Sequence, residues 1–241
     1  MCGRFTLFSS PRELQWFFNA HPAALDIKPN YNVAPTQEIP VIIQHEGERH
    51  IKKRHWGLVP VWVEEKAIGC KMINARVETV TSKSAFRTAI KQRRCLIPAD
   101  GFYEWQGKSG SKQPYYIHLP SSELFAFAGL WEVWENKKAP PEDGPYKSCT
   151  IITTEASDSV KDIHNRMPLI LKPEFYDEWL DPENKDPIRI ENILKNGCVK
   201  EFKRYPVSKL VNHVGNNSEE CMKPLTYISD RETLESAPKK T

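Results

Sequence analysis

Short strand-like runs, punctuated by proline, constrain the fold of this chain more than any other sequence feature. Among 241 residues there are 19 Pro and only 11 Gly, and proline fixes turns while ending helices. Seven runs are rich in apolar, β-branched or aromatic residues and are bounded by Pro, Gly or Asp, which is typical of strands. They occupy residues 41–44, 96–98, 102–105, 115–119, 124–130, 148–153 and 169–171. Because they cluster in the middle of the chain without regular strand–helix alternation, they predict an α+β fold with a mainly antiparallel sheet.

Four helix starts accompany these strands. The clearest is the segment 10–13, Ser-Pro-Arg-Glu, which has the pattern of a capping box with proline at the first helical position. Further helices are expected after Ser82, from Pro173 and over 187–196, where the following Gly197 predicts a left-handed cap. The chain therefore has few helices, and all of them are short.

The length of the chain allows one domain with a substantial core, which needs neither disulfides nor metal to fold. We expect a single domain over 1–229 and a polar tail over 230–241, with the polar insert 136–144 forming a hairpin loop. The six cysteines show no C-x-x-C motif and no Cys/His pair at zinc-finger spacing. No metal site is expected.

Charge and hydropathy exclude some classes of protein. The 34 Lys and Arg against 31 Asp and Glu give a net charge of only +3, which does not by itself indicate a nucleic-acid partner, although a local basic patch can be offset by acids elsewhere. The sequence contains no apolar run long enough to cross a bilayer, and its first residues lack the pattern of a signal peptide. We expect a soluble, cytoplasmic protein without a membrane partner.

Cys2 differs from the other cysteines by its position. Removal of Met1, which a small second residue permits, would leave Cys2 with a free amine next to its thiol. Both groups are partly in their nucleophilic forms near neutral pH. The amine can condense with an aldehyde to an imine, and the thiolate can add to the same carbon to close a thiazolidine ring. The alternative is that a cysteine at the second position is incidental.

Two further segments carry polar residues that could bind a ligand or transfer protons. In NARVET, Asn74 and Arg76 would share one face of an extended segment, where an amide can hold a carbonyl or hydroxyl and a guanidinium a phosphate. The same residues also fit a helix-entry turn. In DIHNRMP, His164 can move protons near neutral pH, and Arg166 could reach the same side of an extended loop. A lone histidine is more commonly a hydrogen-bonded core or surface residue.

Glu104 lies between aromatic residues just after an Asp-Gly turn signal. If it shares the face of Phe102, it points inward and its pKa is raised toward the range suited to proton transfer. If it faces water, it is an ordinary charge on a strand. The sequence leaves both orientations open.

Taken in order, six segments resemble the motif set of the SOS response-associated peptidase (SRAP) family. They are MCGRF, YNVAPT (31–36), WGLVP-W (56–62), NARVET (74–79), ADGFYEW (99–105) and DIHNRMP (162–168), and the resemblance extends to VNHVGNN (211–217). It implies an α+β fold whose core is a barrel-like, mainly antiparallel sheet with a few short helices. It also implies a monomer without a cofactor.

The resemblance implies that the chain shields abasic sites in single-stranded DNA, including sites at junctions with double-stranded DNA, by a covalent cross-link. Cys2 would be the nucleophile, and Glu104 would transfer protons at the amine and imine and could reverse the reaction. His164 would lie near the sugar hydroxyl or phosphate, and Asn74 would orient the amine or the deoxyribose. The family's "peptidase" name refers to autocatalytic release of Met1, although ordinary aminopeptidase processing would suffice.

The DNA contacts implied by the resemblance surround these residues. They are Arg4, Arg76 and Arg166 as phosphate ligands, Trp62 as a base-stacking residue, and Pro35 as a wedge between two arms of DNA. Two positions depart from the family: Val63 stands where some relatives have a second aromatic residue, and Ser84 where we align an arginine. Both departures bear on the affinity for DNA and on the preference for single- or double-stranded DNA next to the abasic site, and not on the chemistry.

Two other functions fit parts of the sequence. Glutamine amidotransferases with an amino-terminal nucleophile also begin Met-Cys-Gly and use the cysteine thiolate, but the segments around Asn74, Glu104 and His164 match the SRAP pattern. A non-covalent single-stranded-DNA binder that has lost catalysis is the other alternative, although all four expected reactive residues are retained.

Overall fold

Two sheets dominate the computed structural model, which describes residues 2–21, 26–108, 110–135 and 144–225. The smaller sheet has the order β14-β9-β8-β1-β3. Its strands are β1 (Phe5–Leu7), β3 (Asn30–Val33), β8 (Gly101–Gln106), β9 (Gln113–His118) and β14 (Lys203–Pro206).

The larger sheet follows the order β12-β11-β10-β7-β4-β5-β2, with β13 paired to β10 and β6 to β11. Its strands are β2 (Ala20–His21), β4 (Glu38–His45), β5 (Glu48–Trp56), β6 (Asn74–Arg76), β7 (Arg94–Ala99), β10 (Phe125–Trp134), β11 (Tyr146–Glu155), β12 (Arg166–Pro168) and β13 (Ile170–Leu171). A parallel pairing between β11 and β5 closes five of these strands into a ring. The predicted α+β class with mainly antiparallel sheets is confirmed, and the ring corresponds to the expected barrel-like core.

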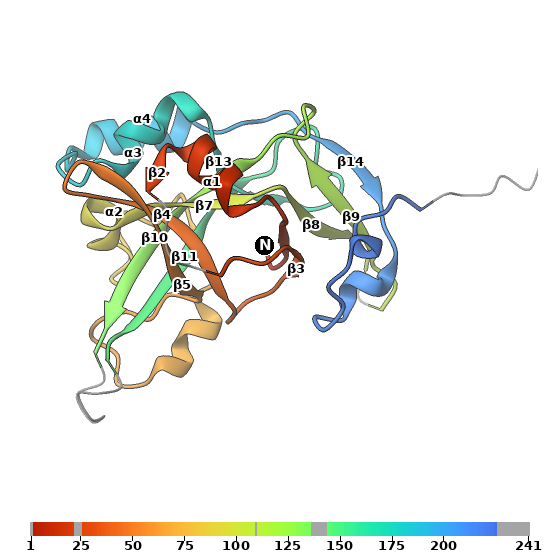
Figure 1. Ribbon diagram of the computed structural model, residues 1–241, viewed down its shortest axis with the longest axis horizontal. Coiled ribbons are helices and arrows are strands. Elements are labelled where there is room, and N and C mark those ends of the chain that lie inside the picture. The colour runs from red at the N-terminus through yellow and green to blue at the C-terminus, as the bar shows by residue number, and fades with distance from the viewer. Residues whose placement is uncertain (1, 22–25, 109, 136–143, 226–241) are drawn as a thin grey trace, which may run out of the picture.

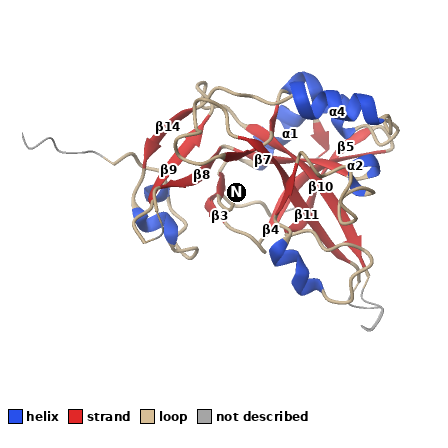
Figure 2. Ribbon diagram, turned by 180° about the vertical axis from the view of Figure 1, so that it is seen from behind, coloured by secondary structure: helices blue, strands red, loops and turns tan. Residues whose placement is uncertain are grey.

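The α-helices are short and lie outside the sheets. They are α1 (Pro11–Phe18), α2 (Ala89–Gln92), α3 (Tyr176–Leu180) and α4 (Pro187–Asn196). Helices α1, α3 and α4 gather at one end of the molecule, and β9 and β14 form the other end (Figures 1 and 2). In the part of the chain that the structure describes, no helix is both long and apolar enough to span a membrane.

The helix ends test the sequence predictions directly. The capping box before α1 is present, because Ser10 Oγ accepts the amide of Glu13 and the Glu13 carboxylate accepts the amide of Ser10. The predicted left-handed cap at Gly197 is wrong, since its φ is −81°. Glycine is needed there for space, because an added Cβ would lie 2.6 Å from the carbonyl oxygen of Ile193 and 3.0 Å from Leu171 Cδ1. Of the helix expected after Ser82, only α2 is α-helical.

Strand β1 joins the two sheets and sets the position of the first residues. It pairs with β3 and β8 in the small sheet. The buried Phe5 makes edge contacts with Trp56 and Phe127 of the large sheet, with ring centroids 5.3 and 5.5 Å apart. The Trp56 indole in turn donates a hydrogen bond to the carbonyl of Ile73, next to β6. The start of the chain is therefore held between the sheets.

Candidate active site

Cys2 lies three residues before the start of β1 and is completely buried. Its backbone carbonyl accepts a 2.8 Å hydrogen bond from Asn74 Nδ2. Burial raises the pKa of the Cys2 thiol well above its ordinary value, and the negative charge of Glu104 raises it further. The thiol is therefore neutral in this structure, and Asn74 and Glu104 both lie in its surroundings. Met1 lies outside the described residues.

Glu104 occupies the inward face of β8. It is paired in register with Tyr115 and is only 4% exposed, on the same face as the fully buried Phe102. Desolvation by burial raises the pKa of Glu104 to about 7. A carboxyl group with this pKa can donate and accept a proton at neutral pH. The structure thus places Glu104 in the inward orientation that the sequence left open.

Asn74 begins β6 and pairs with Ile151 of β11 in parallel register. This strand excludes the helix-entry turn as the structure of the segment. While Nδ2 holds Cys2, Asn74 Oδ1 is buried and accepts no hydrogen bond within the described part of the chain. Arg76, two residues on, is exposed. Asn74 therefore fixes the first residues of the chain and has acceptor capacity to spare.

His164 lies in the loop that leads into β12. Burial lowers the pKa of the imidazole, and a positive charge at Lys112 contributes in the same direction. His164 Nδ1 lies 3.0 Å from the backbone N and 3.1 Å from the carbonyl O of Arg166, so Arg166 holds this side of the ring in either neutral tautomer. Gln106 of β8 holds this loop by donating to the carbonyl of Asp162.

Lys112 is a charged residue of this region that the sequence analysis did not single out. It lies just before β9, and its charge acts on both Glu104 and His164. For Glu104, burial raises the pKa, and the positive charges of the amino terminus and, to a smaller extent, of Lys112 partly offset that increase. No sequence motif marks Lys112, because its proximity to both residues depends on how the β8–β9 hairpin faces the loop before β12.

An open cavity of about 770 Å³ is lined in part by His164, whereas Cys2, Asn74 and Glu104 are not among its lining residues. It is lined by Arg76, Glu155, Ala156, Lys161, His164, Asn165 and Arg166. The strand that begins at Asn74 and the loop that carries His164 thus meet at one opening. This cavity, with basic side chains on its walls, is suited to a ligand that carries phosphates.

Arg4 serves the fold more than the sequence suggested. One guanidinium nitrogen, Nη1, donates to Asn32 Oδ1 and to the carbonyl of Val211, each at 2.6 Å. Asn32, which the sequence analysis missed, is buried, and its Nδ2 donates to the carbonyls of Val211, His213 and Asn216. These contacts tie the start of the chain to the segment 211–217. Asn32 and Val211 lie in two of the segments that resemble the SRAP family, and no other sequence signal marked them.

Trp62 and Pro35 stand on turns at the surface. Trp62 is 61% exposed, and its turn is anchored by a 2.8 Å hydrogen bond from Trp134 Nε1 to the carbonyl of Val63. Pro35 lies in the turn between β3 and β4, where the following Thr36 has a φ of 72°. That conformation is strained for a β-branched residue, and it is held by a hydrogen bond from Thr36 N to the carbonyl of Trp56.

Arg166 is not a free surface residue. Its side chain is 12% exposed and forms a two-point ion pair with Glu78. Nη2 also donates to the carbonyl of Thr153 at 2.6 Å. Of the three arginines predicted to contact phosphates, Arg76 is the one with an exposed side chain, and Arg4 and Arg166 are already hydrogen-bonded within the protein.

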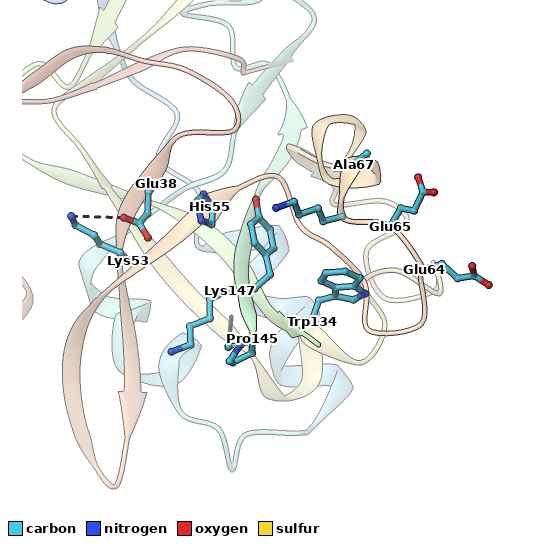
Figure 3. Close-up of a pocket in the computed structure, with 12 residues that line it drawn as sticks. Glu38, Lys53, His55, Glu64, Glu65, Ala67, Trp134, Pro145 and Lys147 are labelled. Carbon is cyan, nitrogen blue, oxygen red and sulfur yellow. Dashed lines mark ion pairs between the residues drawn. The ribbon is translucent and has the colours of Figure 1, made fainter. Parts of the chain in front are cut away.

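A second cavity, of about 680 Å³, contains none of the predicted site residues. Figure 3 shows Glu38, Lys53 and His55 on one side and Glu64, Glu65 and Trp134 on the other. Its charged and aromatic groups contact one another: Lys53 pairs with Glu38 at 3.8 Å, and Tyr146 stacks on His55 with centroids 4.5 Å apart. Among the described residues, no group of His, Cys, Asp and Glu side chains is arranged to hold a metal ion.

The sequence and the fold both match proteins of one family. Residues 1–214 match the family model described as SOS response associated peptidase (SRAP). The chain is 45% identical over 225 residues to the abasic site processing protein YoqW of Bacillus subtilis strain 168, an alignment that covers 92% of this chain and 99% of that protein. It is 33% identical over 245 residues to the abasic site processing protein HMCES of Gallus gallus, covering 88% and 71%.

Solved structures share the fold. A protein from Bacteroides thetaiotaomicron superposes with a TM-score of 0.79 at 23% identity, over 93% of this chain and all of that one. A phage-related protein from Bordetella bronchiseptica gives a TM-score of 0.66 at 31% identity, over 86% and 94%.

Proposed function

The chain belongs to the SOS response associated peptidase family, and we propose that it captures abasic sites in single-stranded DNA through a covalent bond to Cys2. Relatives that are 45% and 33% identical are named abasic site processing proteins. The observation that carries the proposal is the arrangement around Cys2. Asn74 donates a hydrogen bond to its carbonyl, and the Glu104 carboxyl, with a pKa of about 7, is near enough for its charge to raise the pKa of the thiol.

The reaction follows from the chemistry of an aminothiol. Once Met1 is removed, the Cys2 amine attacks C1′ of the ring-opened deoxyribose, and the carbinolamine loses water to give an imine. The sulfur then adds to the imine carbon, and the thiol proton passes to the imine nitrogen. One aldehyde and one aminothiol thus give a thiazolidine and one water. The imine is consumed, so the β-elimination that would break the strand is blocked.

Glu104 is proposed to move the protons in these steps. Its protonated form donates to the departing hydroxyl, and its carboxylate accepts the proton of the thiol. A pKa of about 7 keeps both forms populated at neutral pH. The same group can run the sequence backward, which makes the cross-link reversible. As a secondary part of the proposal, the chain releases its own Met1.

His164 and Asn74 are proposed to act on the sugar and on the terminus. The His164 ring is held at Nδ1 by Arg166 and lines the cavity, where it would exchange a proton with the sugar hydroxyl or hydrogen-bond a phosphate and so favour ring opening. Asn74 keeps the Cys2 carbonyl fixed, so that the amine is presented in one orientation.

The DNA path is proposed to run over the surface around this site. Arg76, Arg4 and Arg166 would contact phosphates, and the exposed Trp62 would stack on a base. Pro35, on its rigid turn, would separate two arms of DNA at a junction. We propose that the protein works as a monomer in the cytoplasm and associates with the nucleoid when it is bound to DNA.

A denaturing gel tests the proposal. Protein whose mass shows that Cys2 is the first residue is incubated with a single-stranded oligonucleotide that carries one abasic site. We expect a heat-stable shifted band, and none with a tetrahydrofuran analogue, which lacks the aldehyde. Absence of the band would exclude covalent capture. A shift on a native gel alone would indicate a non-covalent binder, and hydrolysis of glutamine would indicate the amidotransferase.

A further inference from the structure

Glu78 lies outside the proposed reaction but makes the most directed ion pair in this region. Its two carboxylate oxygens each accept a hydrogen bond from a different terminal nitrogen of Arg166, and the second of these measures 3.1 Å. Such two-point pairs fix the planes of both groups. Arg166 is almost buried, and the pair joins residues 88 positions apart in the sequence.

The pair crosses the end of a strand. Strands β6 and β12 flank β11 on opposite edges, and Thr153 is in register with residues of both. From β12, the Arg166 side chain reaches over β11 to Glu78, just beyond β6. The carbonyl of Thr153 accepts hydrogen bonds from Arg166 Nη2 and from the backbone N–H of Val77. The two outer strands are therefore clamped to the same point of β11.

The clamp also reaches two residues of the proposed site. Asn74 begins the strand that leads to Glu78, and it holds the Cys2 carbonyl. On the other side, His164 Nδ1 lies within hydrogen-bond distance of both the backbone N and the carbonyl O of Arg166. The ring of His164 is thus oriented by the same residue whose guanidinium Glu78 holds.

We propose that Glu78 is a positioning residue that, through Arg166, fixes the ring of His164 relative to Asn74 and the first residues of the chain. This inference rests on the proposed function, which it deepens. It assigns to Glu78 no contact with DNA. Because Glu78 carries a negative charge beside a surface meant for phosphates, its removal affects affinity and rate in different directions.

The test separates these two quantities in Glu78→Gln. The affinity for DNA is measured by fluorescence anisotropy with the tetrahydrofuran oligonucleotide, which cannot cross-link. The rate is measured at saturating protein with the abasic oligonucleotide. We expect the maximal rate to fall by about tenfold or more, as for loss of a charge-assisted hydrogen bond, while the affinity is unchanged or tighter. A general loss of structure would weaken both.

Asp177→Asn is a matched control. Asp177 pairs with Arg49, whose side chain is 14% exposed, between β5 and α3 and away from the site. We expect this variant to keep both the rate and the affinity. An unchanged maximal rate in Glu78→Gln would overturn the inference, and so would a parallel loss of rate and affinity.

Hydrogen exchange provides a test that does not depend on the reaction. In Glu78→Gln, the amides of Val77 and Arg166 should exchange faster, although they lie on opposite sides of β11, and they should be unaffected in Asp177→Asn. If both amides remain protected, the clamp is refuted even when wild-type protein cross-links. If wild-type protein does not cross-link but the amides respond as expected, the clamp stands and the proposed function fails.

Discussion

The floor of the proposed site and its rim are built from different parts of the fold. The floor consists of the buried Cys2 and Glu104 and the half-buried Asn74. Asn74 and Glu104 lie on strands, and Cys2 lies three residues before one. The rim includes Trp62 and Pro35, which stand on turns between strands. Desolvation shifts the pKa values needed for proton transfer, whereas contact with DNA needs exposed groups. Changes in the floor should therefore alter the rate, and changes in the rim should alter affinity.

Two arginines do not fit this division. Arg4 and Arg166 were predicted for the rim, but both are hydrogen-bonded to protein groups from distant segments. Their side chains hold distant segments together, and Arg76, two residues after Asn74, is the exposed one of the three. Substitutions at Arg4 and Arg166 should thus disturb the structure as well as DNA binding, which makes them poor probes of the rim.

The largest effect is expected at the floor, for Cys2→Ala. This variant should form no heat-stable cross-link, because it lacks the sulfur that closes the ring, while its amine can still form an imine that borohydride traps. Denaturing gels with and without borohydride measure both. Cys70→Ala is the control, since Cys70 is exposed, and it should behave as wild type. A heat-stable band from Cys2→Ala would show that another nucleophile reacts.

Glu104→Gln should slow cross-linking by about 100-fold or more, the usual contribution of a general acid–base. The wild-type rate should change with pH around 7, following the pKa of about 7, and the variant should lose that inflection. Glu155→Gln, which changes another carboxylate at the cavity, should keep it. A pH profile unaltered by Glu104→Gln would remove this residue from the proton-transfer steps.

The same group gives a prediction for stability. The pKa of Glu104 is raised in the folded state from 4.5 to about 7, so the folded protein binds the extra proton between these values. Wild-type stability should therefore fall as the pH rises through this window, by about 3 kcal/mol in total. Glu104→Gln should lack that decline. Urea unfolding at pH 5 and pH 8 measures the free energy of unfolding of both proteins. An equal decline between the two pH values in wild type and variant would contradict the assignment.

At the rim, Trp62→Ala should weaken binding of the tetrahydrofuran oligonucleotide by about 1–3 kcal/mol, the usual value for one stacked base. The maximal cross-linking rate should stay near that of wild type. Trp16→Ala is the matched control, because Trp16 is 86% exposed on α1, away from the site. A loss of rate without loss of affinity would place Trp62 with the floor.

The smallest effect is expected for Arg76→Ala. Loss of one phosphate contact should reduce the slope of log affinity against log salt by about 0.7, as for single-stranded DNA, and weaken binding only modestly. Arg189→Ala, on the exposed surface of α4, should leave the slope unchanged. Anisotropy titrations at several salt concentrations measure both variants, and an unaltered slope for Arg76→Ala would exclude a phosphate contact.

Local patterns explain which parts of the fold were predictable. The helix start at Ser10 and the seven strand runs were identified because hydrogen bonds and alternation act over a few residues. Strand β5 was missed because lysine, arginine and histidine dominate its sequence. At β6 the sequence left an extended segment and a helix-entry turn open, because the strand has only three residues and is defined by its partner β11. The predicted left-handed cap at Gly197 was wrong because the close approach of the Ile193 carbonyl, and not backbone handedness, requires glycine there.

The sequence by itself determined the fold class, the position of Cys2 next to the start of the chain, and the order of the motifs that carry the proposed chemistry. Only the tertiary structure decided which of those residues are desolvated and what holds them. The partners of Arg4 and Arg166 lie up to 207 positions away, and the proximity of Lys112 to Glu104 arises from packing. Burial and charge pairing depend on distances in space, and no local pattern encodes them.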